Sequence, residues 1–271
     1  MPPTPEARSL AVFCDFENIA LGVREAKYDK FDMEKVLERL LAKGSIVVKK
    51  AYCDWDRYKE FKTAMHAAAF ELIEIPHRGQ SGKNSADIRM VVDALDLCYT
   101  KQHVDTFVII SGDSDFSPLV SKLRENAKAV IGVGVKNSSS DLLISNCDEF
   151  IYYDDLVRED EAKRRAAKKR RETRPAGAAK EAAPSDDKKQ EAFDLVIETL
   201  QALIAERGED ERIWGSMVKQ ALKRRKPGFN ESYYGFKAFS DLLEEAEARK
   251  LVALERDEKS GGYIIRPVTG A

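Results

Sequence analysis

The apolar run VDTFVIIS, residues 104–111, limits the possible folds of this chain more than any other feature of its sequence. Nearly every residue in the run is apolar, which predicts a strand whose two faces are both buried. Such a strand is typical of the centre of a parallel sheet, where helices cover both faces. We therefore expect an α/β domain around this run.

Strand and helix patterns alternate on both sides of this run. Patterns with apolar residues at helical spacing occupy 31–44, 56–70, 87–100, 115–126 and 138–147. Apolar runs that predict further strands occupy 9–14, 45–53, 71–75, 128–135 and 149–153. Between the first strand and the first helix pattern we interpret DFENIALG, residues 15–22, as a turn. Short connections between alternating strands and helices predict a parallel sheet with helices on both faces.

The composition changes sharply after residue 157. The next segment carries almost no apolar bulk and is densely basic between Lys163 and Arg174, which predicts a linker. Three helix patterns follow, the third from Tyr233 to Lys250, and two apolar runs then flank a Lys-Ser-Gly-Gly turn that predicts a β-hairpin. Three helices and a terminal hairpin predict a small winged-helix domain. We assign 8–157 to the α/β domain, 158–190 to the linker and 191–268 to the winged helix.

The bulk composition excludes few classes of protein. Lysine plus arginine (45) nearly balance aspartate plus glutamate (47), so only the distribution of positive charge can indicate nucleic-acid binding. The four cysteines form no CxxC pair, so we expect free thiols and no structural zinc site. The sequence has no signal-peptide pattern, and no apolar run approaches the roughly 18 residues of a membrane helix. We therefore expect a soluble cytoplasmic protein that does not associate with membranes.

Acidic residues follow two of the predicted strands. Asp15 ends the first strand, and Asp113 and Asp115 follow the strand at 104–111. In open parallel sheets, ligands bind beyond the carboxyl ends of the strands, where the strand order reverses. If these two strands are neighbours, the three carboxylates converge there, and Asp87, at the start of a helix, could complete the group.

Carboxylates that share a small site repel one another unless a cation lies between them. Oxygen-only ligands select Mg²⁺ or Mn²⁺ over zinc, so the four aspartates predict such a metal site. An aspartate after a strand also commonly caps the next helix, so Asp113 taken alone has a simpler explanation. Asp93 lies six residues after Asp87, about 120° around the same helix, and is not expected to face the same ion.

Two other kinds of site are disfavoured. The residues after the first strand, DFENIALG, lack the glycines that let a dinucleotide pyrophosphate approach the backbone. A phosphatase with an aspartyl nucleophile stays an alternative, although DFE is not the usual DxD arrangement. The histidines, His66, His77 and His103, show no spacing typical of metal ligands.

At these residues the sequence resembles a known family. The segments AVFCDFENIA, GKNSADIRMVVDAL and FVIISGDSDFSPLVSKLRENAKAVIGVG are similar to the three motifs of NYN domains, in the PIN-like nuclease superfamily. The resemblance covers roughly residues 8–155. It implies that Asp15, Asp87, Asp113 and Asp115 hold Mg²⁺ or Mn²⁺ for RNA cleavage, and that Asn18 and Ser111 support them.

The C-terminal residues resemble a second family, the OST-HTH/LOTUS winged helix. The resemblance rests on YYGFKAFSDLLEEAEARKLVAL followed by GGYIIRP, and it implies binding of RNA or of a protein partner. Tyr233, Tyr234 and Phe236 are candidates for stacking on bases, although aromatic residues at helical spacing are more often core. We interpret a set of basic residues as candidate phosphate contacts. These are Lys83, Lys223, Arg224, Arg225 and Lys226.

The preferred hypothesis is a metal-dependent ribonuclease, most simply an endonuclease, with an RNA-binding C-terminal module. The second hypothesis is a catalytically silent adaptor that binds RNA or protein. A phosphatase is the third.

Overall fold

The computed structural model describes residues 8–28, 30–75, 85–161, 184–208, 211–257 and 261–268. These residues form two compact units, one built mainly from 8–161 and the other mainly from 184–268. Within the described ranges, no helix is both long and apolar enough to cross a membrane. All four cysteines are free thiols, as predicted.

The first unit is built around a six-stranded sheet with the order β3-β2-β1-β4-β5-β6. The strands are β1 (Arg8–Asp15), β2 (Gly44–Cys53), β3 (Glu71–Glu74), β4 (Thr106–Ile110), β5 (Ala129–Gly134) and β6 (Glu149–Tyr152). The predicted central strand is confirmed, because β4 pairs in parallel with both β1 and β5 and all of its residues are buried. The chain builds β1 to β3 on one side and then returns past β1, so the strand order reverses between β1 and β4.

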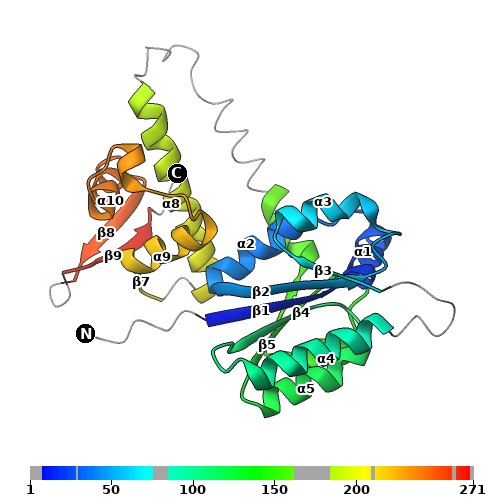
Figure 1. Ribbon diagram of the computed structural model, residues 1–271. Helices are drawn as coiled ribbons and strands as arrows, with labels where there is room; N and C mark the ends of the chain where they lie inside the picture. Colours follow the sequence, from blue (N-terminus) through cyan, green and yellow to red (C-terminus); the bar gives the residue numbers. More distant parts are fainter. Residues whose placement is uncertain are drawn as a thin grey trace. The chain divides into compact units, whose positions relative to one another are not determined.

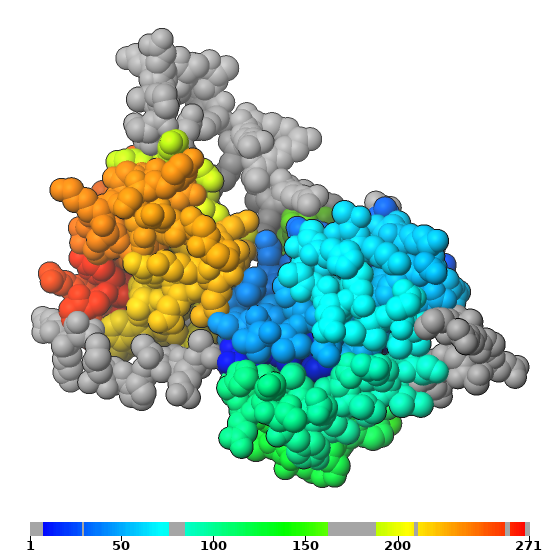
Figure 2. All heavy atoms as spheres, in the orientation of Figure 1, coloured from blue at the N-terminus to red at the C-terminus, as the bar shows by residue number. Residues whose placement is uncertain are grey.

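Helices cover both faces of this sheet, as predicted. They are α1 (Phe16–Glu25), α2 (Met33–Lys43), α3 (Lys59–Ala67), α4 (Ser85–Thr100), α5 (Ser117–Glu125) and α6 (Asp141–Asn146), with the 3-10 turn η2 (Ser114–Phe116). In Figure 1, α4 and α5 lie on one face of the sheet, and α1, α2 and α3 lie on the other. The green segments that contain α4 and α5 form one side of this unit's surface (Figure 2).

The interpretation of residues 15–22 as a turn is wrong, because α1 begins directly after β1. Asp15 caps this helix by accepting a hydrogen bond from the backbone N–H of Asn18. Phe16, Ile19 and Val23 recur at helical spacing and are all buried. Gly22 permits close packing, since a Cβ there would lie 2.4 Å from Ser138 Oγ.

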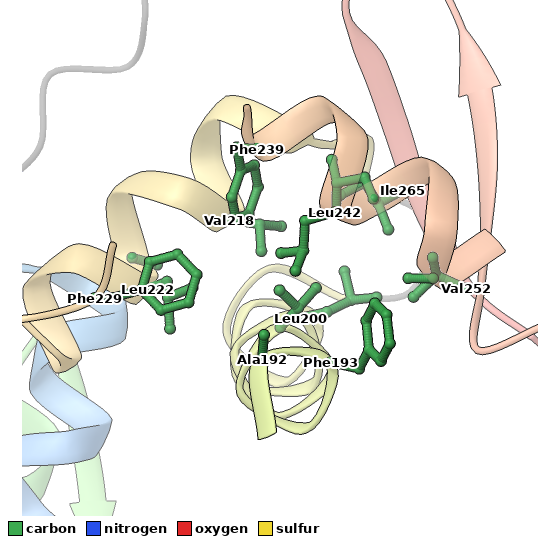
Figure 3. Close-up of a cluster of buried hydrophobic side chains, with 14 of the residues drawn as sticks. Ala192, Phe193, Leu200, Val218, Leu222, Phe229, Phe239, Leu242, Val252 and Ile265 are labelled. Atoms are coloured by element: carbon green, nitrogen blue, oxygen red, sulfur yellow. The ribbon is translucent and has the colours of Figure 1, made fainter. Parts of the chain in front are cut away.

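The second unit has the predicted winged-helix arrangement. It contains α8 (Pro184–Arg207), β7 (Ile213–Trp214), α9 (Gly215–Arg225), η3 (Glu231–Tyr234), α10 (Phe239–Ala248), β8 (Val252–Arg256) and β9 (Tyr263–Pro267). Its sheet is antiparallel with the order β7-β9-β8, and β8 and β9 form the predicted hairpin. Figure 3 shows its core, in which Leu200 of α8, Val218 of α9 and Leu242 of α10 point toward one another.

Two boundaries in this unit differ from prediction. The helix predicted from Tyr233 to Lys250 is interrupted, because Gly235 has a left-handed backbone (φ 86°) and ends η3 before α10 begins. Helix α8 begins at Pro184, within the segment that we assigned to the linker. Residues 162–183 of that segment lie outside the described residues.

Candidate active site

The carboxyl ends of β1 and β4 bring the first predicted site residues together. The register pairs Cys14 with Ile110, so Asp15 and Ser111 follow side by side at the same edge of the sheet. Ser111 Oγ donates a hydrogen bond to Asp15 Oδ2 (3.1 Å) and accepts one from the backbone N–H of Asp113 (3.2 Å). Asp15 and Ser111 are 7% and 0% exposed, so this pair is held firmly within the unit.

Asn18 ties the loop after β4 to helix α1. Its Oδ1 accepts a hydrogen bond from the backbone N–H of Gly112 (2.9 Å), while its own backbone N–H donates to Asp15 Oδ1 (3.3 Å). Gly112 packs against the chain at Ser138, since a Cβ at this position would lie 2.4 Å from the Ser138 carbonyl oxygen. These contacts fix the backbone from which the Asp113 side chain extends.

Asp113 is the N-cap of η2, with Oδ1 accepting a hydrogen bond from the backbone N–H of Asp115 (3.0 Å). Asp113 therefore does cap the following turn, as its position after a strand suggested. It does not exclude a second role, because Asp113 Oδ2 has no hydrogen-bond partner among the described residues. Asp115 lies on the exposed side of the same short turn.

Asp87, in the first turn of α4, interacts electrostatically with this group. The pKa of Asp87 is raised to about 6, mainly by burial and in addition by the charges of Asp113, Asp115 and Glu17. Burial is also the main cause that raises the pKa of Asp15 to about 7, and Asp87 and Asp113 add to it. The hydrogen bonds from Asn18 and Ser111 to Asp15 act in the opposite direction. The four predicted aspartates therefore share one electrostatic environment.

Positive charge does not compensate these four aspartates. Within the described ranges, none of Asp15, Asp87, Asp113 and Asp115 forms an ion pair with lysine or arginine. Glu17, which the sequence reasoning missed although it lies two residues after Asp15, is paired with Arg57 (3.3 Å). Across the same residues, no three His, Cys, Asp or Glu side chains are arranged closely enough to hold a metal ion.

The donor chemistry of the four aspartates nevertheless fits a divalent cation. All the donors are carboxylate oxygens, which Mg²⁺ and Mn²⁺ prefer. Mg²⁺ usually keeps several of its waters and needs only one or two carboxylates as direct ligands. Carboxylates that raise one another's pKa are also groups whose repulsion a cation would relieve.

Asp93 has a different environment from Asp87, although both lie on α4. Its carboxylate accepts hydrogen bonds from Tyr52 Oη (2.9 Å) and Arg89 Nε (3.0 Å) and pairs with Lys50 Nζ (3.3 Å). Burial acts to raise the pKa of Asp93, but the hydrogen bond from Tyr52 and the charges of Lys50 and Arg89 outweigh it and lower the pKa. These contacts agree with the expectation that Asp93 lies outside the acidic group.

A shallow depression adjoins the acidic group on the surface of the first unit. It begins at Asp115 and runs along the start of α5 toward α6. Its lining consists of Ser114, Asp115, Ser117, Pro118, Ser121, Leu142 and Asn146. Five of the seven lining residues carry polar side chains that a ligand near Asp115 could contact.

The basic residues that we predicted as phosphate contacts differ in burial and in their partners. Arg225 donates hydrogen bonds to Glu198 (2.8 Å) and Thr199 (3.3 Å) of α8, so it serves the packing of α9 on α8 and is wrong as a phosphate contact. Arg224 is half-buried, whereas Lys223 and Lys226 are exposed. Lys83 lies outside the described residues.

A parallel sheet with helices on both faces, and with aspartates at the edge where the strand order reverses, defines the class of PIN-like nuclease folds. Residues 9–154 match the family model of the NYN domain, and the chain belongs to this family. Residues 193–263 match the model of the OST-HTH/LOTUS domain, so the predicted order of the two domains is confirmed. NYN domains generally are ribonucleases that use divalent metal ions, and OST-HTH/LOTUS domains are associated with RNA.

Two relatives are themselves without an assigned function. An uncharacterized protein of Methanocaldococcus jannaschii is 31% identical over 124 residues, which cover 44% of this chain. The match covers 47% of that protein, so the chain spans about half the length of this curated relative. The crystal structure of a protein of unknown function from Vibrio parahaemolyticus superposes with a TM-score of 0.51 at 27% identity, over 57% of this chain and 98% of that one.

Proposed function

We propose that this chain is a ribonuclease that hydrolyses RNA phosphodiesters with Mg²⁺ or Mn²⁺, most simply as an endonuclease. One observation carries the proposal. Asp15, Asp87, Asp113 and Asp115 interact at the point where the strand order reverses, and among the described residues no lysine or arginine neutralises them. Buried charges without partners are costly, and they are typical of sites that bind a ligand of opposite charge.

One or two of the four aspartates would bind the cation directly, and the others would contact it through its water molecules. When bound, the ion would lower the pKa of a water molecule and stabilise the charge that develops on the leaving oxygen. Asp15 would be the most rigid ligand, because Ser111 and Asn18 both hydrogen-bond its carboxylate. Asp115 lines the depression at the start of α5, so it would lie nearest to the substrate phosphate.

The choice of RNA as substrate rests on the second unit. Exposed Lys223 and Lys226 lie at the end of α9, where they can bind phosphates. The competing hypothesis, a silent adaptor, is distinguished by turnover, because an adaptor binds RNA with a steep salt dependence and leaves it intact.

Cleavage of labelled RNA tests the proposal. The purified chain is incubated with single-stranded and structured RNAs, each labelled at one end, in Mn²⁺ or in EDTA. We expect shortened products in Mn²⁺ only, and internal cuts if the enzyme is an endonuclease. Intact RNA in every metal would contradict the proposal. Release of phosphate from a phosphomonoester, with RNA left intact, would favour the phosphatase instead.

Charge repulsion at the site predicts that Asp87→Asn stabilises the metal-free protein. The folded-state pKa of Asp87 is about 6, above the unfolded value of about 3.9, so its ionisation weakens the wild-type fold as the pH rises through 6. After allowance for solvent screening, we expect the variant to be about 1 kcal/mol more stable at pH 8 and equal to wild type near pH 4. Thermal unfolding in EDTA across this pH range measures the difference.

Asp93→Asn is the matched control on the same helix. Its carboxylate is paired with Lys50 and Arg89 and its pKa is lowered, so this variant should lose stability at pH 8. If Asp87→Asn also lost stability at pH 8, the four aspartates would not be under mutual repulsion.

A further inference from the structure

Tyr233 is the exposed member of the three aromatic residues considered for base stacking. Phe236 is only 5% exposed and belongs to the core of the second unit. Tyr234 is half-buried and stacks on Phe229, with ring centroids 5.3 Å apart and an interplanar angle of 25°. Tyr233, in contrast, is 60% exposed. A tyrosine ring in water is available to a ligand that has an aromatic face of its own.

The backbone that carries Tyr233 is held at both ends of η3. The side chain of Asn230 caps η3 by accepting a hydrogen bond from the N–H of Ser232 (3.0 Å), and the left-handed Gly235 ends the turn. The Tyr233 ring also packs edge-on against Tyr234, with centroids 5.0 Å apart and an angle of 87°. A ring that is already ordered loses little conformational entropy when a ligand stacks on it.

Ammonium groups from two helices lie near η3, and one of them lies over the Tyr233 ring. Lys188 Nζ of α8 lies 4.5 Å from the centroid of the Tyr233 ring. On the α9 side, Lys219 pairs with Glu231 of η3 (2.7 Å), and Lys223, one helical turn further along, is exposed. The orange segment that contains α9 and α10 forms much of the visible face of this unit (Figure 2). Exposed aromatic and positive groups therefore meet around η3.

This combination favours a single-stranded nucleic acid over other ligands. An unpaired base offers a π-face to the tyrosine, and its flanking phosphates offer negative charge to the lysines. Bases within a duplex already stack on one another and cannot reach a protein ring. A protein partner would not require a lysine over the ring and further lysines beside η3.

We propose that Tyr233 stacks on an unpaired RNA base, with Lys188 and Lys223 binding the flanking phosphates. The base would stack on the ring face opposite Lys188. This site rests on the proposed function only in that RNA is the ligand, since it lies in the second unit and needs neither a metal nor cleavage.

Binding of a short single-stranded RNA to the full chain in EDTA tests the proposal, because RNA cannot be cut there by a metal-dependent enzyme. The RNA carries a fluorescent label for anisotropy and, in a second version, 2-aminopurine, whose fluorescence falls on stacking. We expect Tyr233→Ala to weaken binding roughly 10-fold and to abolish the fluorescence change, while Tyr233→Phe keeps both. Lys223→Ala should lower the slope of log affinity against log salt by about 1.

Tyr99→Ala is the matched control, because Tyr99 has the same exposed fraction, 60%, but lies on α4 of the first unit. This variant should bind within about twofold of wild type. Equal affinities for wild type and Tyr233→Ala would overturn the proposal and favour a protein partner for this surface. Loss of binding in Tyr233→Ala, with no cleavage by wild type in Mn²⁺, would support the stacking site and refute the nuclease.

Discussion

Asp15→Asn is expected to lower the rate of Mn²⁺-dependent RNA cleavage by on the order of 100-fold or more. The substitution removes the charge of the most buried of the four aspartates and keeps a side chain of the same shape. Its amide oxygen can still accept the backbone N–H of Asn18, so α1 keeps its cap. Initial rates of cleavage, measured at saturating RNA over a range of Mn²⁺ concentrations, give the size of the loss.

Asp113→Asn should behave in the same way. Asparagine caps helices as well as aspartate does, so the bond to the N–H of Asp115 survives and only the charge is lost. Asp93→Asn is the control, because Asp93 is paired with Lys50 and Arg89. The cleavage rate of this variant should stay within about threefold of wild type. Rapid cleavage by Asp15→Asn would remove this residue from the metal site.

Gly112→Ala is expected to have the largest effect on stability. The added Cβ would lie 2.4 Å from the Ser138 carbonyl oxygen and 3.0 Å from Ser139 Cα, which are backbone atoms that cannot rotate away. The loop would have to move, and with it the hydrogen bond from Ser140 N to the Gly112 oxygen (2.9 Å). We expect a loss of about 2–3 kcal/mol, which corresponds to a fall in Tm of roughly 5–10 °C.

Gly22→Ala provides a graded comparison within the same unit. Its Cβ would also approach Ser138, at 2.4 Å, but the atom that it meets is the side-chain Oγ, which can rotate to another position. Alanine also favours the helix in which Gly22 lies, so we expect a change in stability of less than about 1 kcal/mol. Equal destabilisation by the two substitutions would contradict this distinction between a fixed backbone atom and a side chain that can rotate.

The sheet of the first unit could be predicted because its strands are apolar runs between more polar segments. A run such as Phe107 to Ile110 is buried on both faces, and few folds accommodate that pattern. Helix α1 could not be predicted in the same way, because Asn18 and Gly22 are typical of turns. Its only signal was the spacing of Phe16, Ile19 and Val23, which is short and follows the strand without a break.

The acidic group could be predicted in part. Asp15, Asp113 and Asp115 follow from strand order alone, because β1 and β4 are neighbours. The place of Asp87 depends on how α4 lies over the sheet, which no local pattern encodes. Arg225 was misinterpreted because a basic run looks uniform in sequence. Arg225 lies four residues after Ala221 and three after Leu222, and both of these residues are buried. At helical spacing this places Arg225 on the face of α9 that is turned toward the core.

The mutual repulsion of the four aspartates has a consequence for how this family can diverge. In the proposed ribonuclease, a substitution that neutralises one of them, such as Asp87→Asn, would remove activity and relieve repulsion in the same step. Most substitutions that abolish a function also weaken the fold, and selection for stability opposes them. At this site the two effects have opposite signs, so silent relatives that retain the fold and bind RNA can arise through single substitutions that favour folding.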